Sequence, residues 1–324
     1  MKLEQVYAPD FDLAMTLDSG QAFHWIRSGD GYAGAIGDQP AYVEQRNGLL
    51  FVNREAGKVA RRYFALDHPL AEICASLPED AAMCAARDFC RGLRIMRQPL
   101  WECLASFITS SMKQVAHIRQ MSHALRTRFG DEKKLSDFVI YAFPAAHRVA
   151  ALHEGDLRKC ALGYRAKNLL KTARLVSSGA ADLNGWRELD DDQLRVRLCE
   201  LPGVGAKVAN CVMLFAYERL RAFPIDVWIE RVLREKYFAR KRKVTPQRLR
   251  TFCDTYFGEH GGYAQQYLFH YARKGGTVRR ATRRGGGRLS LPATCDTVGR
   301  QHKPAGAKEP PERCTLRDSR ATPS

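Results

Sequence analysis

The sequence predicts an α+β protein in which an N-terminal antiparallel β-sheet domain is followed by an all-helical domain. Between residues 23 and 52, short β-like runs alternate with turn signals, and Asn47-Gly48 is a strong hairpin signal because both residues tolerate positive φ. From Leu70 to about Ala272, apolar residues recur at helical spacing. A chain of 324 residues is long enough for two domains, each with its own core.

The predicted strands cover 23–27, 32–36, 41–45 and 49–52, and a domain boundary is placed between residues 90 and 91. Within the helical domain, 91–275, glycine and proline residues mark breaks between helices. Three consecutive aspartates, Asp190 to Asp192, predict the N-cap of a helix that runs through Cys199. A second helix is predicted over 206–217, with Val208, Val212 and Phe215 on its inner side.

The composition changes sharply near residue 275. Residues 276–324 contain no aromatic residue, include Gly285-Gly286-Gly287 and carry two pairs of arginines. Such a segment buries too little apolar surface to offset its chain entropy. We therefore predict a disordered basic tail over 276–324, with weak electrostatic affinity for DNA.

The formal net charge is +17, from 52 Lys and Arg against 35 Asp and Glu. A surface of this sign attracts polyanions, so nucleic acid is the leading partner. The ten cysteines form no C-x-x-C pair, which argues against a zinc ribbon or an iron–sulfur cluster and is typical of a reducing compartment. We expect no signal peptide, no membrane span and a monomer.

The run Leu201 to Gly205 carries the main functional signal. Gly203 and Gly205 flank Val204, which allows a sharp turn between two helices and brings backbone N–H groups close to a phosphate. Lys207 follows at the start of the next helix, where its amine would lie beside a bound strand and act either as a nucleophile or as a phosphate contact. Asp226 would be its electrostatic partner, a helix cap, or both.

Seven motifs in order make residues 1–275 resemble the helix-hairpin-helix DNA glycosylases, and within them the 8-oxoguanine DNA glycosylase/lyases. These motifs are Ser19-Gly20-Gln21-Ala22-Phe23-His24-Trp25, Tyr63-Phe64-Ala65-Leu66-Asp67, the run Glu102 to Ser111, Leu162-Gly163-Tyr164-Arg165-Ala166, the glycine hairpin with Lys207, Pro224-Ile225-Asp226-Val227, and Tyr263-Ala264-Gln265-Gln266-Tyr267-Leu268-Phe269. So many motifs in one order make coincidence a poor explanation.

The resemblance implies a bifunctional DNA N-glycosylase and AP lyase of base excision repair that acts on 8-oxoguanine in duplex DNA. It implies that Lys207 attacks the sugar C1′, expels the damaged base and holds the sugar as a Schiff base until β-elimination cuts the strand. Asp226 would stabilise the positive charge that develops on the sugar. It further implies that Phe269 and Cys211 enclose the flipped base, that Gln265 reads its Watson–Crick edge, and that the carbonyl of Gly20 accepts the N7–H of the lesion.

The residues implied to replace the flipped base and to face the orphaned cytosine depart from the best-known eukaryotic members. Met112 begins Met112-Lys113-Gln114 where those members have an asparagine run, and His117 stands where they have an arginine. Trp228 stands where they have histidine. Tyr164, as a wedge, and Arg165 are retained. These departures put recognition of the opposite base in doubt and leave the predicted chemistry unchanged.

The resemblance requires no cofactor and no iron–sulfur cluster, and suggests a Na⁺ or K⁺ ion at the backbone carbonyls of Cys199, Leu201 and Val204. The expected location is the nucleoid or cytoplasm of a bacterium, or the nucleus of a eukaryote. Two alternatives stay open. A helix-hairpin-helix glycosylase for alkylated bases would activate water and would not need Lys207, whereas a non-catalytic helix-hairpin-helix DNA-binding protein would have no reason to carry Lys207 and Asp226 together.

Overall fold

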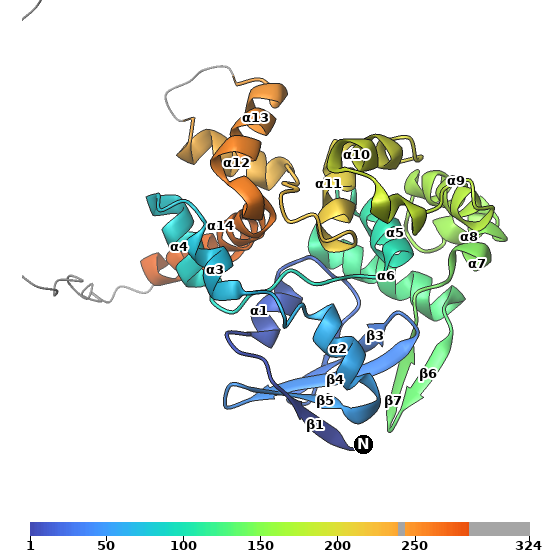
Figure 1. Ribbon diagram of the computed structural model, residues 1–324. Coiled ribbons are helices and arrows are strands. Elements are labelled where there is room, and N and C mark those ends of the chain that lie inside the picture. The colour runs from blue at the N-terminus through green and yellow to red at the C-terminus, as the bar shows by residue number, and fades with distance from the viewer. Residues whose placement is uncertain (239–243, 285–324) are drawn as a thin grey trace, which may run out of the picture. The chain divides into compact units, whose positions relative to one another are not determined.

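The computed structural model describes residues 1–238 and 244–284, and of 275–284 only the backbone. An antiparallel sheet of five strands forms the N-terminal part, in the order β1-β5-β4-β3-β2 (Figure 1). The strands are β1 (Leu3–Val6), β2 (Ile26–Ser28), β3 (Gly31–Ile36), β4 (Gln39–Arg46) and β5 (Leu49–Asn53). Helices α1 (Leu13–Asp18) and α2 (Gly57–Tyr63) contribute to the same core as the strands. The predicted class, an antiparallel sheet followed by a helical domain, is confirmed.

The hairpin at Asn47-Gly48 is confirmed, because β4 pairs with β5 and the two turn residues have φ values of +50° and +78°. The strand predicted over 23–27 is only three residues long and begins at Ile26. The first strand, β1, was missed at the sequence level. It pairs only with β5, and its sequence Leu-Glu-Gln-Val is too short and too polar to stand out as a strand.

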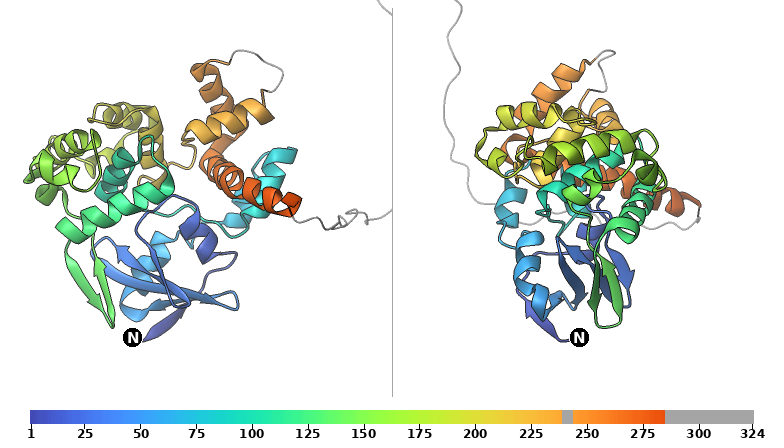
Figure 2. Two further views of the ribbon diagram at one scale, coloured as in Figure 1. Left: turned by 180° about the vertical axis from the view of Figure 1, so that it is seen from behind. Right: turned by 90° about the vertical axis from the view of Figure 1, so that its right-hand side faces the viewer.

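The remaining helices form two groups, which lie on opposite sides of the upper part of the molecule (Figures 1 and 2). The first group contains α3 (Leu70–Ala75), α4 (Ala81–Phe89), α12 (Val227–Lys236), α13 (Pro246–Tyr256) and α14 (Gly261–Arg284). The second contains α5 (Leu100–Ser110), α6 (Val115–Phe129), α7 (Ala146–Ala150), α8 (Glu154–Arg158), α9 (Arg165–Ser177), α10 (Asp191–Cys199) and α11 (Ala206–Phe215). Short 3₁₀ turns occupy Arg54–Ala56, Gly185–Glu188 and Gly258–His260.

One hairpin interrupts the region that the sequence predicts as all-helical. Strands β6 (Glu132–Leu135) and β7 (Phe138–Tyr141) pair with each other and pack against β3 and β4. The ring of Phe138 stacks on that of Tyr42 with centroids 5.4 Å apart. Two strands alone are marginal in water, so this hairpin depends on the N-terminal sheet, a contact that a local pattern cannot reveal.

A buried ionic cluster joins the sheet to α5. His24 bonds the carbonyl of Ala35 in β3 at 2.8 Å, and its other ring nitrogen lies 3.3 Å from the carboxylate of Glu102 at the start of α5. Arg126 in α6 binds the same carboxylate and the carbonyl of Tyr141. Burial lowers the pKa of His24, and the charge of Arg126 lowers it further. The cluster thereby ties α5, which contributes to the site described below, to the rigid sheet.

Helix α14 continues to Arg284, so residues 276–284 are helical rather than part of a disordered tail. Extending an existing helix adds one hydrogen bond for each residue ordered, and the arginine and alanine residues of this stretch are good helix formers. The rest of the predicted tail, 285–324, lies outside the described residues. Within the described ranges, no helix has the length and apolar character needed to cross a membrane.

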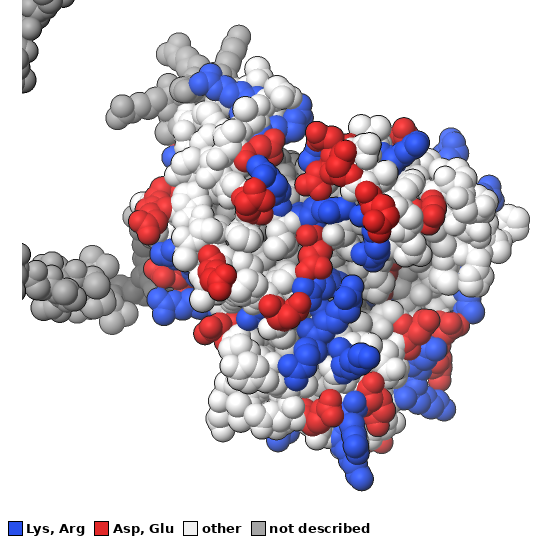
Figure 3. Space-filling model, in the orientation of Figure 1, with Lys and Arg blue, Asp and Glu red and all other residues white. Residues whose placement is uncertain are grey.

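Basic side chains on the face shown in Figure 3 are interspersed with acidic ones. Charges of opposite sign also pair between distant parts of the chain, as where Arg97 binds both Asp67 and Glu218. This face therefore carries charges of both signs rather than one continuous basic surface.

Candidate active site

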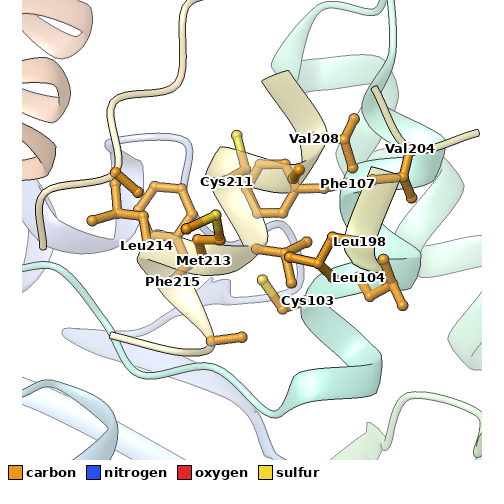
Figure 4. Close-up of a cluster of buried hydrophobic side chains, with 14 of the residues drawn as sticks. Cys103, Leu104, Phe107, Leu198, Val204, Val208, Cys211, Met213, Leu214 and Phe215 are labelled. Carbon is orange, nitrogen blue, oxygen red and sulfur yellow. The ribbon is translucent and has the colours of Figure 1, made fainter. Parts of the chain in front are cut away.

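The predicted pair of helices joined by a glycine hairpin is present. Asp190 caps α10 by accepting a hydrogen bond from the backbone N–H of Gln193 at 2.8 Å, and α11 begins at Ala206. Between them, Gly203 has φ +84°, and a Cβ there would lie 2.8 Å from the Cβ of Asn168 in α9. Glycine is therefore required at this position by both conformation and space. Leu198, Val204 and Val208 hold the two helices together through a buried apolar cluster (Figure 4).

Lys207 lies in the first turn of α11 with its side chain partly buried. Its Nζ is 5.1 Å from the centre of the Phe107 ring, which comes from α5 and stacks on Phe215. Its amine also hydrogen-bonds the thiol of Cys211, one turn further along α11. Burial raises the pKa of Cys211 to about 11, although the nearby Lys207 charge opposes this shift. The thiol therefore stays neutral and serves as an apolar wall of the site.

Asp226 precedes α12 and caps it, because its Oδ1 accepts a hydrogen bond from the N–H of Ile229 at 2.8 Å. Burial raises the pKa of Asp226, while the bond from Ile229 and the charge of Lys207 both oppose that rise. The carboxylate thus lies within electrostatic reach of the Lys207 amine while one of its oxygens is held by the helix. The helix-cap interpretation of Asp226 is confirmed, and a chemical role is compatible with it.

A small cavity collects side chains from five separate segments of the chain. It is lined by Gly20, Phe107, Lys207, Cys211, Phe215, Pro224, Asp226, Gln265, Gln266 and Phe269. Its volume is about 40 Å³, well below the roughly 150 Å³ of a cavity that accepts a benzene ring. A purine does not fit, so side chains lining the cavity have to move before a base can enter.

The residues predicted to bind the base lie together in this cavity. Gln265 and Phe269 project from one face of α14, as their spacing of four predicts, and Cys211 and Gly20 lie on other walls. The side-chain oxygen of Gln265 is buried, and no donor within the described part of the chain reaches it. A buried acceptor without a partner is costly unless a ligand supplies one. Gly20 has φ +90°, which favours glycine over any other residue.

The residues predicted to face the opposite base do not line the cavity. Met112 is 93 % exposed with φ +54°, Tyr164 is 56 % exposed, and His117 is exposed in the first turn of α6. Arg165 is buried, and its Nε donates to the carbonyl of Ser111 at 2.8 Å. Its guanidinium carbon lies 4.4 Å from the centre of the Tyr164 ring. In this structure its donors are bound to the protein backbone, so a contact with cytosine requires an exchange of partners.

The sequence did not single out every side chain at the site, and Phe107 and Arg273 are two of those it missed. Phe107 was quoted only as part of a motif, yet its ring lies beside the Lys207 amine. Arg273, one turn after Phe269, lies against both Phe269 and Gly20. The contacts of Phe107 with Lys207 and of Arg273 with Gly20 have no local signal, because each joins segments far apart in the sequence. Residues 1–238 and 244–284 contain no cluster of three or more His, Cys, Asp or Glu side chains arranged to hold a metal ion.

Two family models match the chain in succession. Residues 5–104 match the N-terminal domain of 8-oxoguanine DNA glycosylase, and residues 105–255 match the HhH-GPD superfamily of base excision DNA repair proteins. The chain is 31% identical to an N-glycosylase/DNA lyase of Saccharomyces cerevisiae over 74% of its own length and 72% of that protein. It is 29% identical to a probable N-glycosylase/DNA lyase of Methanothermobacter thermautotrophicus, covering 84% of this chain and 96% of the relative.

A solved structure shares the fold over most of its length. The 8-oxoguanine glycosylase/lyase of Clostridium acetobutylicum, in complex with double-stranded DNA that contains cytosine opposite 8-oxoguanine, superimposes with a TM-score of 0.78. Its sequence is 30% identical, and the match covers 85% of this chain and 99% of that protein. The similarity thus extends over both the sheet and the helical part.

Proposed function

The chain belongs to the 8-oxoguanine N-glycosylase/DNA lyase family, and we propose that it excises 8-oxoguanine from duplex DNA and cuts the strand at the resulting site through a lysine Schiff base. The observation that carries the proposal is the shared cavity. One amine and one carboxylate, Lys207 and Asp226, open into the same cavity as the base-binding candidates Gly20, Gln265 and Phe269.

The first step is attack by Lys207. As the bond between its Nζ and the sugar C1′ forms, the bond from C1′ to the base breaks, and the base leaves with the bonding electrons and takes up a proton. Opening of the sugar ring then gives the iminium form of the adduct. Removal of a C2′ proton and cleavage of the bond from C3′ to the phosphate oxygen cut the strand by β-elimination. Water later releases the lysine.

Asp226 acts on charge in the first step. The sugar becomes positive as the base departs, and a carboxylate fixed beside C1′ stabilises that charge without having to reorganise. Its hydrogen bond with Ile229 fixes one oxygen, and burial strengthens the attraction by excluding water. The same carboxylate accepts a proton from the attacking amine and passes it to the departing base.

Recognition of the lesion rests on two acceptors. 8-Oxoguanine carries a hydrogen at N7, whereas guanine has a lone pair there, so the Gly20 carbonyl attracts the lesion and repels the normal base. The unpaired side-chain oxygen of Gln265 accepts from N–H groups on the Watson–Crick edge. Phe269 supplies a ring on which the flipped base stacks.

Borohydride trapping on a duplex with one 8-oxoguanine tests this proposal. The wild-type chain forms a covalent adduct that survives denaturation, whereas Lys207→Gln binds the duplex and forms none. A matched control is Lys167→Gln, which removes the same charge from an exposed position on α9 near the hairpin. A glycosylase that activates water would excise a base without an adduct, and a non-catalytic DNA-binding protein would leave the duplex intact, so the assay separates all three activities.

We further propose that the hairpin holds a monovalent cation through the carbonyls of Cys199, Leu201 and Val204. Helix α10 ends at Cys199, and the last carbonyls of a helix carry partial negative charge without helical partners. Leu201 accepts one hydrogen bond, from Val204 N–H at 3.1 Å, and a carbonyl oxygen has two lone pairs. Replacing KCl by choline chloride at constant ionic strength should lower the melting temperature and weaken DNA binding, and equal values in both salts would contradict the site.

No redox or metal cofactor enters the proposed reaction, because amine, carboxylate and amide groups supply every step. We propose that the protein acts as a monomer on genomic DNA, in the nucleoid or cytoplasm of a bacterium or in the nucleus of a eukaryote.

A further inference from the structure

Arg273 reaches from α14 to the loop that carries Gly20. Its Nη2 donates a hydrogen bond to the carbonyl of Asp18 at the end of α1. Its guanidinium carbon lies 5.1 Å from the centre of the Phe269 ring, within the range of a cation–π contact. A single side chain thus contacts both the loop that presents the Gly20 carbonyl and the ring on which the base stacks.

Gly20 packs directly against this guanidinium. A Cβ on Gly20 would lie 2.7 Å from Nη1 of Arg273 and 3.3 Å from Cε1 of Phe269, so the three groups form one contact surface. Gln266, also from α14, donates to the carbonyl of Ser19 at 3.1 Å. Two α14 side chains therefore hold consecutive carbonyls, those of residues 18 and 19, immediately before Gly20.

The guanidinium is not paired in the manner of a purely structural arginine. Arg94, which joins distant segments of the core, pairs both of its Nη atoms with backbone carbonyls. In Arg273, by contrast, Nη1 is buried with no acceptor among the described residues, while its Nε lacks an acceptor just as the Nε of Arg94 does. Burial and the neighbouring Arg119 lower its pKa, while Asp18 and Asp226 oppose the shift. A buried donor without a partner is costly, so the Nη1 of Arg273 stabilises the free protein less than a fully paired guanidinium nitrogen would.

We propose that Arg273 is a positioning residue that sets the discrimination between 8-oxoguanine and guanine, by fixing the Gly20 carbonyl relative to the Phe269 ring. The inference rests on the proposed function. Discrimination at N7 depends on where one carbonyl oxygen stands, because attraction to N7–H and repulsion from the N7 lone pair both weaken with distance and angle. The hydrogen bond to Asp18 restrains the loop, and the guanidinium face restrains the ring.

The test is the ratio of two dissociation constants, for a duplex with guanine and for the same duplex with 8-oxoguanine. All measurements use the Lys207→Gln background, which keeps both duplexes intact. Arg273→Met preserves the length and apolar stem of the side chain but removes the planar cation. We expect this variant to lower the ratio at least about tenfold, the lower end of the range for losing one hydrogen bond to a charged group. Arg273→Lys should be intermediate, because it keeps the charge and loses the flat face.

Lys274→Met is the matched control. It removes one positive charge from the neighbouring, exposed position of the same helix. We expect it to weaken binding of both duplexes equally and to leave their ratio unchanged. An unchanged ratio of dissociation constants in a folded Arg273→Met protein would overturn the positioning role of Arg273. An equal decrease of the ratio in Lys274→Met would overturn it as well. If Arg273→Met fails to fold, the Arg273→Lys ratio decides on the same criterion.

Different results refute the proposed function and the role of Arg273. A parent Lys207→Gln protein that binds both duplexes equally would refute the proposed function, and the role of Arg273 with it. A parent that prefers 8-oxoguanine, together with an Arg273→Met variant of equal preference, would refute only the role of Arg273.

Discussion

Asp226 caps a helix and has a proposed chemical role, and two substitutions at this position separate the two. Asparagine keeps a side-chain oxygen that accepts the hydrogen bond from Ile229 N–H, now 2.8 Å long, but carries no charge. Alanine removes both the oxygen and the charge. The two variants therefore differ in stability and agree in chemistry if both roles are real.

The expected magnitudes follow from the contacts. Asparagine and aspartate are nearly equivalent N-caps, so Asp226→Asn should change the free energy of unfolding by less than about 0.5 kcal/mol. Asp226→Ala should lose about 1 kcal/mol, the usual effect of removing a cap. Both should slow single-turnover excision by about 10²- to 10³-fold, the range for losing one preorganised group that stabilises transition-state charge.

Urea unfolding measures the first quantity, and single-turnover excision on an 8-oxoguanine duplex measures the second. The pH dependence adds a further check. Burial raises the pKa of Asp226, and the reaction requires the ionised form, so the rate should fall with decreasing pH at a higher pH than the ordinary aspartate value of about 3.9. That acidic limb should be absent in Asp226→Asn. A near-normal excision rate in Asp226→Asn would reduce this residue to a helix cap.

Three further predictions concern other parts of the molecule. Burial opposes ionisation of Glu218, but hydrogen bonds from His68 and Arg97 outweigh it and lower its pKa to about 2. The stabilisation from its ionised carboxylate is thus present above about pH 4.3 and is lost as the pH falls toward 2. In urea titrations, Glu218→Gln should therefore lower the free energy of unfolding by about 1 kcal/mol at pH 7, after screening of this partly exposed group, and by nothing at pH 2. Gly203→Ala should lower the melting temperature and weaken DNA binding, because its Cβ collides with Asn168 and its φ is +84°; unchanged binding would show that the hairpin tolerates a side chain. His117 offers fewer hydrogen-bond donors than arginine. Excision should therefore prefer cytosine over thymine or guanine opposite the lesion by a smaller factor than in arginine-bearing relatives. His117→Arg should raise that preference about five- to hundredfold in single-turnover assays.

The features that the sequence predicted correctly are those with local causes. The turn at Asn47-Gly48 forms because both residues tolerate positive φ. Helix α10 starts where it does because Asp190 accepts a hydrogen bond from the backbone N–H three residues later. The shared face of Gln265 and Phe269 follows from helical geometry alone. Each of these features depends on fewer than ten consecutive residues, so the pattern contains all the information needed.

The features that were missed have distant causes. Strand β1 exists because β5 offers it an edge, and the β6–β7 hairpin exists because Tyr42 and its neighbours offer it a surface. Neither segment has a strong pattern of its own. The extension of α14 past residue 275 is a milder case, in which an established helix continues through residues whose composition alone indicates disorder.

The cavity contains residues that belong to local motifs and residues placed by distant contacts. The sequence therefore identified the first kind and missed the second. Lys207, Asp226, Gln265 and Phe269 were identified through motifs, since the groups proposed to react with or touch the base lie within short runs of the sequence. Arg273 touches Asp18, 255 positions away, and acts on the base only through Gly20 and Phe269. A residue that acts through others is recognised from its contacts in the structure and not from a motif in the sequence around it. Members of one family can therefore share every residue that touches the lesion and still discriminate it to different degrees, because the groups that hold those residues in place are free to differ.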